Sequence, residues 1–370
     1  MRYHIWLRET AKLSCDKACK LICTLGSAQA VYDASVGKLS SLVSLTEKDK
    51  EGLLCRNLEP ADKIIENCKT QDIKILTFSD KEYPQRLRDI FSPPVVLYVR
   101  GNLPKIDELP VFAIVGSRRP NYDSKTFAEE MAQNLTKAGM TVVSGLAEGI
   151  DTCVAEGALK EGSTIAVLGT AIDNPYPKYN SGLYREIIQK GAVISEYPPK
   201  VRTYPSCFIE RNRIIAGLSI GVLVVQAGKK SGSLATARFC EEYGRYVFVS
   251  PGLPTKEEWQ GSNELLRWGA FYTVNCDDIL SQYESIYNFN KIEKIVITEK
   301  TESVLVKNSD TPKGLSDEES LIYAALSQEK RADEISAICN IPAERVSSLL
   351  TMMELMGLVE QNGGQIFRRK

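Results

Sequence analysis

Short apolar runs rich in β-branched residues alternate with amphipathic stretches through the middle of the chain. From residue 111 to residue 252 the runs are "VFAIVGS", "MTVVSG", "STIAVLG", "GAVISE", "IGVLVVQAG" and "RYVFVSPG". The stretches between them predict helices over residues 124–138, 150–160, 181–190, 212–218 and 233–243. Because near-continuous apolar strands that alternate with helices form a parallel sheet covered on both faces, we predict an α/β fold with a Rossmann-like, doubly wound, mostly parallel sheet.

The pattern changes on both sides of this region. Residues 1–70 predict a small module of short helices, of the SAM or helix-hairpin-helix kind, and residues 71–285 form the Rossmann-like core. Residues 286–315 lose the periodicity and predict a linker. In residues 316–370, Ser316 and Glu319 form a capping box at the first of three helices, and "GLVEQNGGQIFRRK" predicts a hairpin around Asn362-Gly363. Three helices and a hairpin predict a winged helix.

Composition narrows the functional classes. Ten cysteines are scattered without the spacing of a disulfide framework, which indicates free thiols and a cytoplasmic location. The longest apolar run, residues 220–225, is too short to span a bilayer, and the N-terminus lacks the apolar region of a signal peptide, so no membrane contact is expected. Neither G-x-G-x-x-G nor a P-loop is present, so ATP hydrolysis and NAD chemistry have no support and no cofactor is expected.

Histidine and cysteine usage argues against metal or triad chemistry. His4 is the single histidine, in a terminus expected to fray. Cys15, Cys19 and Cys23 recur every four residues and so share a helix face. With no fourth ligand in view, a buried apolar stripe is favoured over a metal site.

The ends of the predicted strands carry the chemistry of an anion site. Ligands of such sheets bind at the carboxyl ends of the strands, near the point where the strand order reverses. Glycines there let a ligand approach the backbone, and hydroxyls and helix N-termini donate hydrogen bonds to oxyanions. Although the net charge is −1, residues 200–245 hold eight Lys or Arg against three Glu. The pattern predicts a phosphate-binding site at this edge.

Several ordered segments make a family resemblance specific. They are "IVGSRRP", "VVSGLAEGID", "AVLGTAIDNPYP", "RNRIIAGLS", "SGSLATA" and "VFVSPG…GSNELLRWGA", within about residues 75–275. The chain resembles the DNA-processing protein A family (DprA/Smf). The resemblance implies a protein that is not an enzyme, that binds single-stranded DNA, and that loads the RecA recombinase onto it during natural transformation. It also implies a homodimer.

The resemblance further implies a basic pocket for the backbone and bases of DNA. It is lined by a Gly-Ser-Arg loop, a segment with Phe and Arg-Asn-Arg, and a Ser-Gly-Ser loop. Lys229 and Lys230 lie near a lysine of the family, offset by a residue or two, and are included. The predicted DNA-binding residues are Gly116, Ser117, Arg118, Phe208, Arg211, Asn212, Arg213, Lys229, Lys230, Ser231, Gly232 and Ser233.

The chain departs from the family at four positions of this region. Where the family usually has His, Lys, Pro and Glu, this chain has Ala155, Pro205, Ile209 and Gln226 respectively. These departures affect the details of the pocket and leave the fold prediction unchanged.

Simpler structural interpretations stand beside the binding roles. Asn212 is equally suited to capping a helix that starts there. Arg213 is suited to pairing with Glu210 or with a carboxylate at the sheet edge, and Asp151 to capping its helix or holding the pocket loops. Arg118 follows Gly-Ser at a strand end, where an anion-binding role is favoured.

The predicted winged helix is acidic. Residues 316–370 hold nine Asp or Glu against six Lys or Arg, and Arg345 is the only cation of its presumed recognition helix. Such a face repels a phosphate backbone, which favours a protein-interaction or packing module, with the basic tail Arg368-Arg369-Lys370 as the exception.

Two other functions are weighed against DNA binding. One is a Rossmann-like enzyme such as a nucleotide phosphoribohydrolase, with Glu196 or Asp173 as acid or base. The "P-G-G-x-G-T" loop of those enzymes is absent from this chain. The other is a structural scaffold, which the convergence of anion-binding loops argues against.

Overall fold

The computed structural model describes residues 1–289, 315–326, 330–339, 341, 343–362 and 366–369. Most of the predicted linker, residues 286–315, lies outside this part of the chain. The chain divides into two compact units, Met1–Lys294 and Ile295–Lys370. Each unit is described by itself.

A nine-stranded sheet forms the centre of the first unit, in the order β1-β2-β6-β5-β4-β3-β7-β8-β9. The strand pairs β1–β2 and β2–β6 are antiparallel, and the others are parallel. The six predicted strands are present, whereas β1, β2 and β9 were not predicted. The strands are β1 (Lys74–Thr77), β2 (Val96–Gly101), β3 (Val111–Gly116), β4 (Thr141–Ser144), β5 (Thr164–Leu168), β6 (Ala192–Ser195), β7 (Gly221–Val225), β8 (Tyr246–Val249) and β9 (Phe271–Tyr272).

The strand order reverses between β3 and β7. These strands run parallel and side by side, with Gly116 in register with Val225, so their carboxyl ends meet although more than a hundred residues separate them. A Cβ atom on Gly116 would lie 2.0 Å from the Val225 carbonyl oxygen. Only glycine permits this close approach, and it opens the sheet edge where ligands of doubly wound folds bind.

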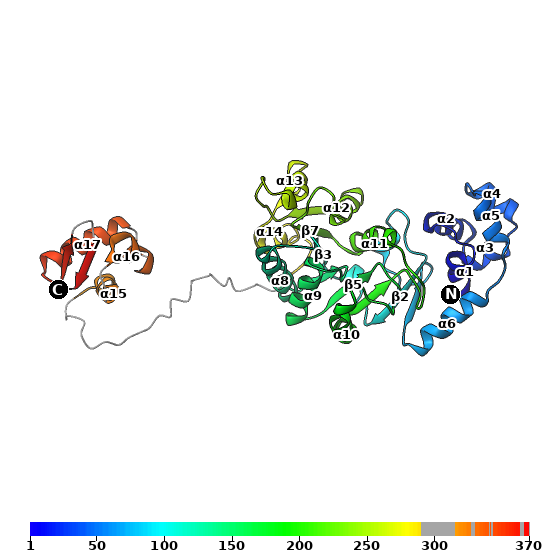
Figure 1. The fold of residues 1–370 in the computed structure, drawn as a ribbon, viewed down its shortest axis with the longest axis horizontal. Coiled ribbons are helices and arrows are strands. Elements are labelled where there is room, and N and C mark those ends of the chain that lie inside the picture. The colour runs from blue at the N-terminus through cyan, green and yellow to red at the C-terminus, as the bar shows by residue number, and fades with distance from the viewer. Residues whose placement is uncertain (290–314, 327–329, 340, 342, 363–365, 370) are drawn as a thin grey trace. The chain divides into compact units, whose positions relative to one another are not determined.

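Helices cover both faces of the sheet. Phe112 and Ile114 of β3 face the apolar stripes of α8 (Tyr122–Lys137) and α9 (Ile150–Glu161). The alternate residues Ala113 and Val115 face α11 (Pro205–Leu218) and α12 (Ser233–Glu242). Figure 1 shows these two helix layers on opposite sides of the sheet. This alternation is the period of two that a strand buried on both faces requires. The remaining helices of this region are α7 (Gln85–Arg88), α10 (Ser181–Lys190), α13 (Gln260–Arg267) and α14 (Asp277–Leu280).

Helix α11 begins seven residues earlier than predicted. It opens with Pro205 at its first position, where the fixed φ of proline suits a helix and its missing N–H costs nothing. Asn212 therefore lies inside the helix, and the interpretation of Asn212 as an N-cap is wrong. The first half of α11 was missed because its residues face a pocket and solvent rather than the core.

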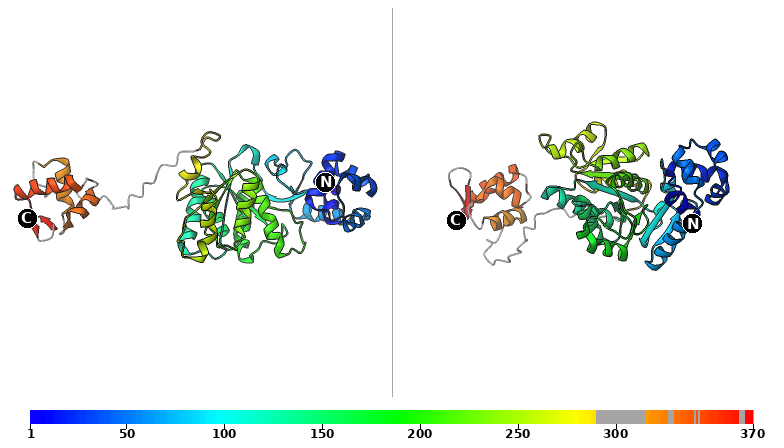
Figure 2. Two further views of the ribbon diagram at one scale, coloured as in Figure 1. Left: turned by 90° about the horizontal axis from the view of Figure 1, so that it is seen from above. Right: turned by 45° about the vertical axis from the view of Figure 1, so that its right-hand side comes forward.

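Six helices precede the sheet and lie beside its β1–β2 edge (Figure 2). Their apolar residues share one core cluster with the sheet. Cys15 and Cys19 are buried as predicted, but Cys23 is exposed. His4 is buried rather than frayed, and its Nε2 lies 2.8 Å from the Ser79 hydroxyl, just after β1. The helices are α1 (Arg2–Glu9), α2 (Cys15–Leu25), α3 (Ala28–Asp33), α4 (Val36–Leu42), α5 (Glu47–Leu54) and α6 (Glu59–Thr70).

The second unit is a winged helix. The predicted capping box of Ser316 and Glu319 is present, and the two strands of the predicted hairpin are paired antiparallel. Gly363 of the predicted turn lies outside the described residues. A short strand that was not predicted extends the hairpin to three strands. The elements are α15 (Asp317–Ala325), β10 (Lys330–Arg331), α16 (Ala332–Cys339), α17 (Ala343–Leu355), β11 (Val359–Asn362) and β12 (Ile366–Arg369).

Candidate functional site

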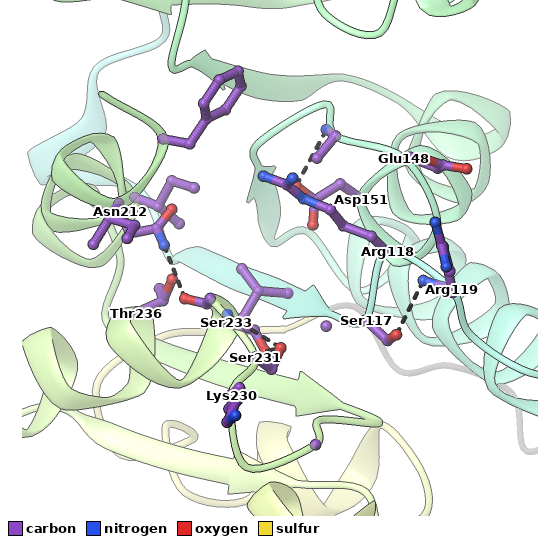
Figure 3. Close-up of a pocket in the computed structure, with 18 of the residues that line it drawn as sticks. Ser117, Arg118, Arg119, Glu148, Asp151, Asn212, Lys230, Ser231, Ser233 and Thr236 are labelled. Atoms are coloured by element: carbon purple, nitrogen blue, oxygen red, sulfur yellow. Dashed lines mark hydrogen bonds between the residues drawn. The ribbon is translucent and has the colours of Figure 1, made fainter. Parts of the chain in front are cut away.

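A pocket of about 720 Å³ opens at the carboxyl edge of the sheet, where the strand order reverses. Four segments line most of it: the loop after β3, the segment from the loop after β4 into α9, the first half of α11, and the loop that leads into α12. Figure 3 shows side chains from these segments around one space. Ten of the twelve predicted residues line this pocket: Gly116, Ser117, Arg118, Phe208, Arg211, Asn212, Lys230, Ser231, Gly232 and Ser233.

Arg118 and Phe208 meet at the pocket. The guanidinium carbon of Arg118 lies 5.5 Å from the centroid of the Phe208 ring. Arg118 is exposed, so its cation is available to a ligand. Gly169 at the end of β5 makes room for the ring, because a Cβ atom there would lie 2.8 Å from Phe208 Cδ1. A cation beside a partly exposed ring is suited to a phosphate and its base together.

The start of α12 offers hydroxyl groups to the same space. The Ser231 and Ser233 hydroxyl oxygens are 2.7 Å apart, and Asn212 Nδ2 donates to the Gly232 carbonyl oxygen at 3.1 Å. The buried Thr236 hydroxyl lines the pocket and has no hydrogen-bond partner among the described residues. The N-terminal end of a helix with hydroxyl groups beside it favours a negatively charged group. Thr236 was not predicted, although its place one turn after Ser233 in "SGSLATA" puts it on the same helix face.

The buried side chain of Arg211 lines the pocket and holds the ends of two strands beside it in place. Its guanidinium is buried and donates hydrogen bonds to the carbonyl oxygens of Gly145, at 2.8 Å, and Val167. Burial lowers the pKa of Arg211 to about 10, so it stays protonated near neutral pH. Asp151 accepts a hydrogen bond from the Ala147 N–H at 3.3 Å, and burial raises the pKa of its carboxyl. Both side chains brace the strand-end loops, as the structural interpretation of Asp151 predicted.

Arg213 lies outside the pocket, so its prediction as a pocket residue is wrong. Its Nη2 donates to both carboxylate oxygens of Glu196, at 2.7 and 2.9 Å. The alternative prediction, pairing with a carboxylate at the sheet edge, is confirmed. The Cys15 thiol donates to the same carboxylate at 2.8 Å, and Arg8 lies 3.9 Å away. Burial opposes ionisation of Glu196, but the neighbouring guanidiniums outweigh it and lower the pKa of this carboxyl.

Lys229 also does not line the pocket. It is exposed on the loop that leads into α12, whereas its neighbour Lys230 does line the pocket. The described part of the pocket therefore has three exposed cations, Arg118, Arg119 and Lys230, with Arg211 buried beneath them. Its carboxylates are Glu148, Asp151 and Glu258.

Glu196 and Asp173, the two acids considered as acid or base of an enzyme, bind other groups outside the pocket. Glu196 is held in the buried cluster with Arg213, and neither it nor Asp173 lines the pocket. Asp173 accepts hydrogen bonds from the Lys200 N–H at 3.0 and 3.2 Å. No group of three or more His, Cys, Asp or Glu within the described residues is arranged to hold a metal ion.

The four departures from the family resemblance have different surroundings. Pro205 and Ile209 line the pocket, while Ala155 is buried in α9 and does not. Gln226 is buried, and its Oε1 accepts a hydrogen bond at 2.9 Å from the backbone N–H of Asn121, the N-cap of α8. Because either an amide or a carboxylate oxygen can accept this bond, Gln226 is suited to the place of a Glu.

Together these features define a Rossmann-like α/β protein with an open, cation-lined pocket at the switch point of its sheet and a separate winged helix. Residues 74–284 match the model of the family described as DNA recombination-mediator protein A, and residues 307–365 match the DprA winged helix domain. The chain belongs to this family, which confirms the resemblance found in the sequence.

Individual relatives support this assignment. The chain is 34% identical to protein Smf of Synechocystis over 336 residues, 85% of this chain and 84% of that protein. It is 40% identical to DNA processing protein DprA of Streptococcus pneumoniae over 206 residues, 55% of this chain and 72% of that protein.

Two solved structures agree with the fold. The X-ray structure of DprA from Streptococcus pneumoniae aligns with a TM-score of 0.68 and 31% identity, covering 79% of this chain and 99% of that one. DNA processing protein A from Helicobacter pylori, which has a single-stranded DNA binding mode, aligns with a TM-score of 0.53 and 33% identity, covering 58% and 97%. Within the described residues, no helix has the length and apolar character needed to cross a membrane.

Proposed function

We propose that this protein binds single-stranded DNA in the pocket between β3, α11 and α12, and that it does so without catalysing a reaction. The observation that carries the proposal is the Arg118 guanidinium 5.5 Å from the Phe208 ring, beside the hydroxyl groups at the start of α12. One side of this arrangement suits a base and the other a phosphate. The DNA binding described for the Helicobacter pylori relative supports the same assignment.

An enzymatic function has less support. The acids that a nucleotide phosphoribohydrolase would use, Glu196 and Asp173, do not line the pocket. Incubation with nucleoside monophosphates separates the two proposals, because an enzyme of that class releases free base and a DNA-binding protein does not. Release of free base that depends on Glu148 or Asp151 would favour the enzyme.

We further propose that the protein delivers its strand to the RecA recombinase, in natural transformation or recombination in the cytoplasm. Membership of the recombination-mediator family supports this partner. The ten free cysteines support a reducing compartment. With this protein added, RecA should form filaments on an oligonucleotide after a shorter lag, which its DNA-dependent ATPase reports. An unchanged lag, with DNA binding intact, would contradict the delivery step alone.

The sheet edge at β9 supports a homodimer. In the described residues β9 pairs only with β8, so it forms an edge of the sheet. Trp268, Phe271, Tyr272 and Val274 are exposed on and around this strand. An open edge with exposed aromatic residues favours pairing with a second chain. Light scattering should give twice the mass of 41.1 kDa for the parent, and Tyr272→Lys should shift it toward the monomer.

A further inference from the structure

Two exposed tyrosines, Tyr176 and Tyr204, lie near Phe208, the aromatic residue that lines the pocket. Tyr204 is the N-cap residue of α11, and Phe208 follows it by four residues, inside the helix. The loop after β5 brings Tyr176 against Phe208, with ring centroids 5.6 Å apart and an interplanar angle of 62°. Tyr176 is 56% exposed and Tyr204 is 60% exposed. Both rings therefore keep most of their surface free to contact a ligand.

Two arginines accompany these rings. Arg118 lies 5.5 Å from the centroid of Phe208, and Arg202 lies 5.8 Å from the centroid of Tyr204. Both arginines are exposed. Exposed rings interleaved with cations are the surface that single-stranded nucleic acids use, because bases stack on the rings while the cations follow the phosphates.

Phe208 connects Tyr176 to the pocket, since its ring lines the pocket and also contacts Tyr176. A base stacked on Phe208 would therefore lie close to Tyr176, and Tyr204 precedes Phe208 by four residues.

We propose that Tyr176 and Tyr204 extend the stacking site of Phe208 into a track on which successive bases of a single-stranded nucleic acid stack outside the pocket. The inference rests on the proposed DNA-binding function and adds two contacting residues to it. We call Tyr176, Tyr204 and Phe208 the track. Its rings stack on the bases, while the pocket cations bind the phosphates of the backbone.

Binding of a fluorescent oligo(dT) to the full-length protein tests the track. Tyr176→Ala and Tyr204→Ala should each weaken binding by about 5- to 160-fold, the range for losing one stacked base. Tyr176→Phe and Tyr204→Phe, which keep the ring, should bind like the parent. Phe91→Ala is the matched control, because Phe91 is 72% exposed and its neighbour Ile90 packs near Gly217, at the far end of α11.

An abasic oligonucleotide of equal length separates stacking from charge. It keeps the phosphates and removes the bases, so the alanine variants and the parent should bind it equally. Each variant should melt at the temperature of the parent, because the rings are exposed.

Normal affinity of both alanine variants for oligo(dT), with the parent binding well, would overturn the track and leave the proposed function standing. An equal loss on the abasic strand would also overturn it. A parent that binds no oligonucleotide would overturn the proposed function and the track with it.

Discussion

Two arginines that lie two positions apart in α11 contact different parts of the molecule. Arg211 and Arg213 are both in the segment "RNR", and the family resemblance implied DNA contact for both, with ion pairing as the alternative for Arg213. Residues two apart on a helix point about 200° apart, since each residue turns the helix by about 100°. Arg211 therefore lies beneath the pocket, while Arg213 points to Glu196. Which of the two faces the ligand depends on the start and rotation of α11, and local sequence does not fix either.

Arg118 is the residue whose loss should weaken DNA binding most directly. It is exposed, lines the pocket and stacks on Phe208, and no carboxylate pairs with it in the salt bridges of the described residues. Arg118→Ala should weaken binding of single-stranded oligonucleotides by about 1.5–3 kcal/mol, the range for hydrogen bonds to charged groups. Fluorescence anisotropy measures this change.

Arg185→Ala provides the matched control for this prediction. Arg185 is an exposed arginine of α10 that does not line the pocket, so its loss removes the same charge without the contact. An Arg118→Ala protein that melts normally and binds as tightly as the parent would remove Arg118 from the site.

Among the helices and strands, the sequence predicted those whose apolar residues form a regular pattern. The six strands between Val111 and Val249 were predicted because each is buried on both faces and so forms a continuous apolar run. Strand β9 was missed because it is two residues long and exposed. The first half of α11 was missed because it faces the pocket. The half of α11 that faces the pocket thus carries a weaker periodic signal than the strands buried on both faces.

Tyr176, Tyr204 and Thr236 were missed for a related reason. The two tyrosines lie at loop and helix-start positions, where a single aromatic residue has no pattern to distinguish it. Thr236 looks like an ordinary helical residue, and only its unpartnered hydroxyl in the pocket singles it out.

Helix α1 is attached to the core through an interaction that should depend on pH. Burial, together with the nearby N-terminal charge, lowers the pKa of His4 from 6.5 to about 4. Because the folded state favours neutral His4, its contribution is fully present above pH 6.5 and is lost as the pH falls toward 4. Acid should therefore destabilise the first unit by up to about 3 kcal/mol over this range.

Melting temperatures from pH 7.5 to pH 4 measure this effect. His4→Gln keeps a hydrogen-bonding group near Ser79 and cannot titrate, so it should show a shallower decline than the parent. Parallel pH profiles for the two proteins would show that His4 is not the titrating group.

The buried carboxylate Glu196 fixes α11 to β6 and to the N-terminal helices. It contacts Arg213 and Cys15 directly, and all three side chains are buried. Glu196→Gln leaves the charge of Arg213 buried without its partner, which should lower the free energy of unfolding by about 3–5 kcal/mol. Chemical denaturation measures this loss.

The double variant Glu196→Gln, Arg213→Met tests the cause. Removing both charges should cost less than removing Glu196 alone, because no unpaired buried charge remains. A double variant that is less stable than Glu196→Gln would show that the pair does not act as a unit.

For the whole molecule, the question is whether the winged helix contributes to strand binding. Arg345 of α17 lies 3.0 Å from Glu318 in an ion pair, and Arg369 stacks on Tyr323, with its guanidinium carbon 4.5 Å from the ring centroid. These cations are engaged within the unit, and the unit is acidic overall. Deleting residues 316–370 should leave single-strand affinity within about 2-fold of the parent, since phosphate binding needs available cations. Loss of most binding in a folded truncation would assign the winged helix a DNA-binding role.

Single-strand binding in the pocket is the central claim, and a salt titration tests it most directly. Single- and double-stranded oligonucleotides of one sequence are titrated with the protein over a series of salt concentrations. Three exposed pocket cations, Arg118, Arg119 and Lys230, predict a log–log slope of about −2 per protomer on single strands, at about −0.7 for each neutralised phosphate. The single strand should also bind more tightly than the duplex, whose paired bases cannot stack on Phe208. Equal affinity for the duplex, or an affinity that does not change with salt, would contradict the account.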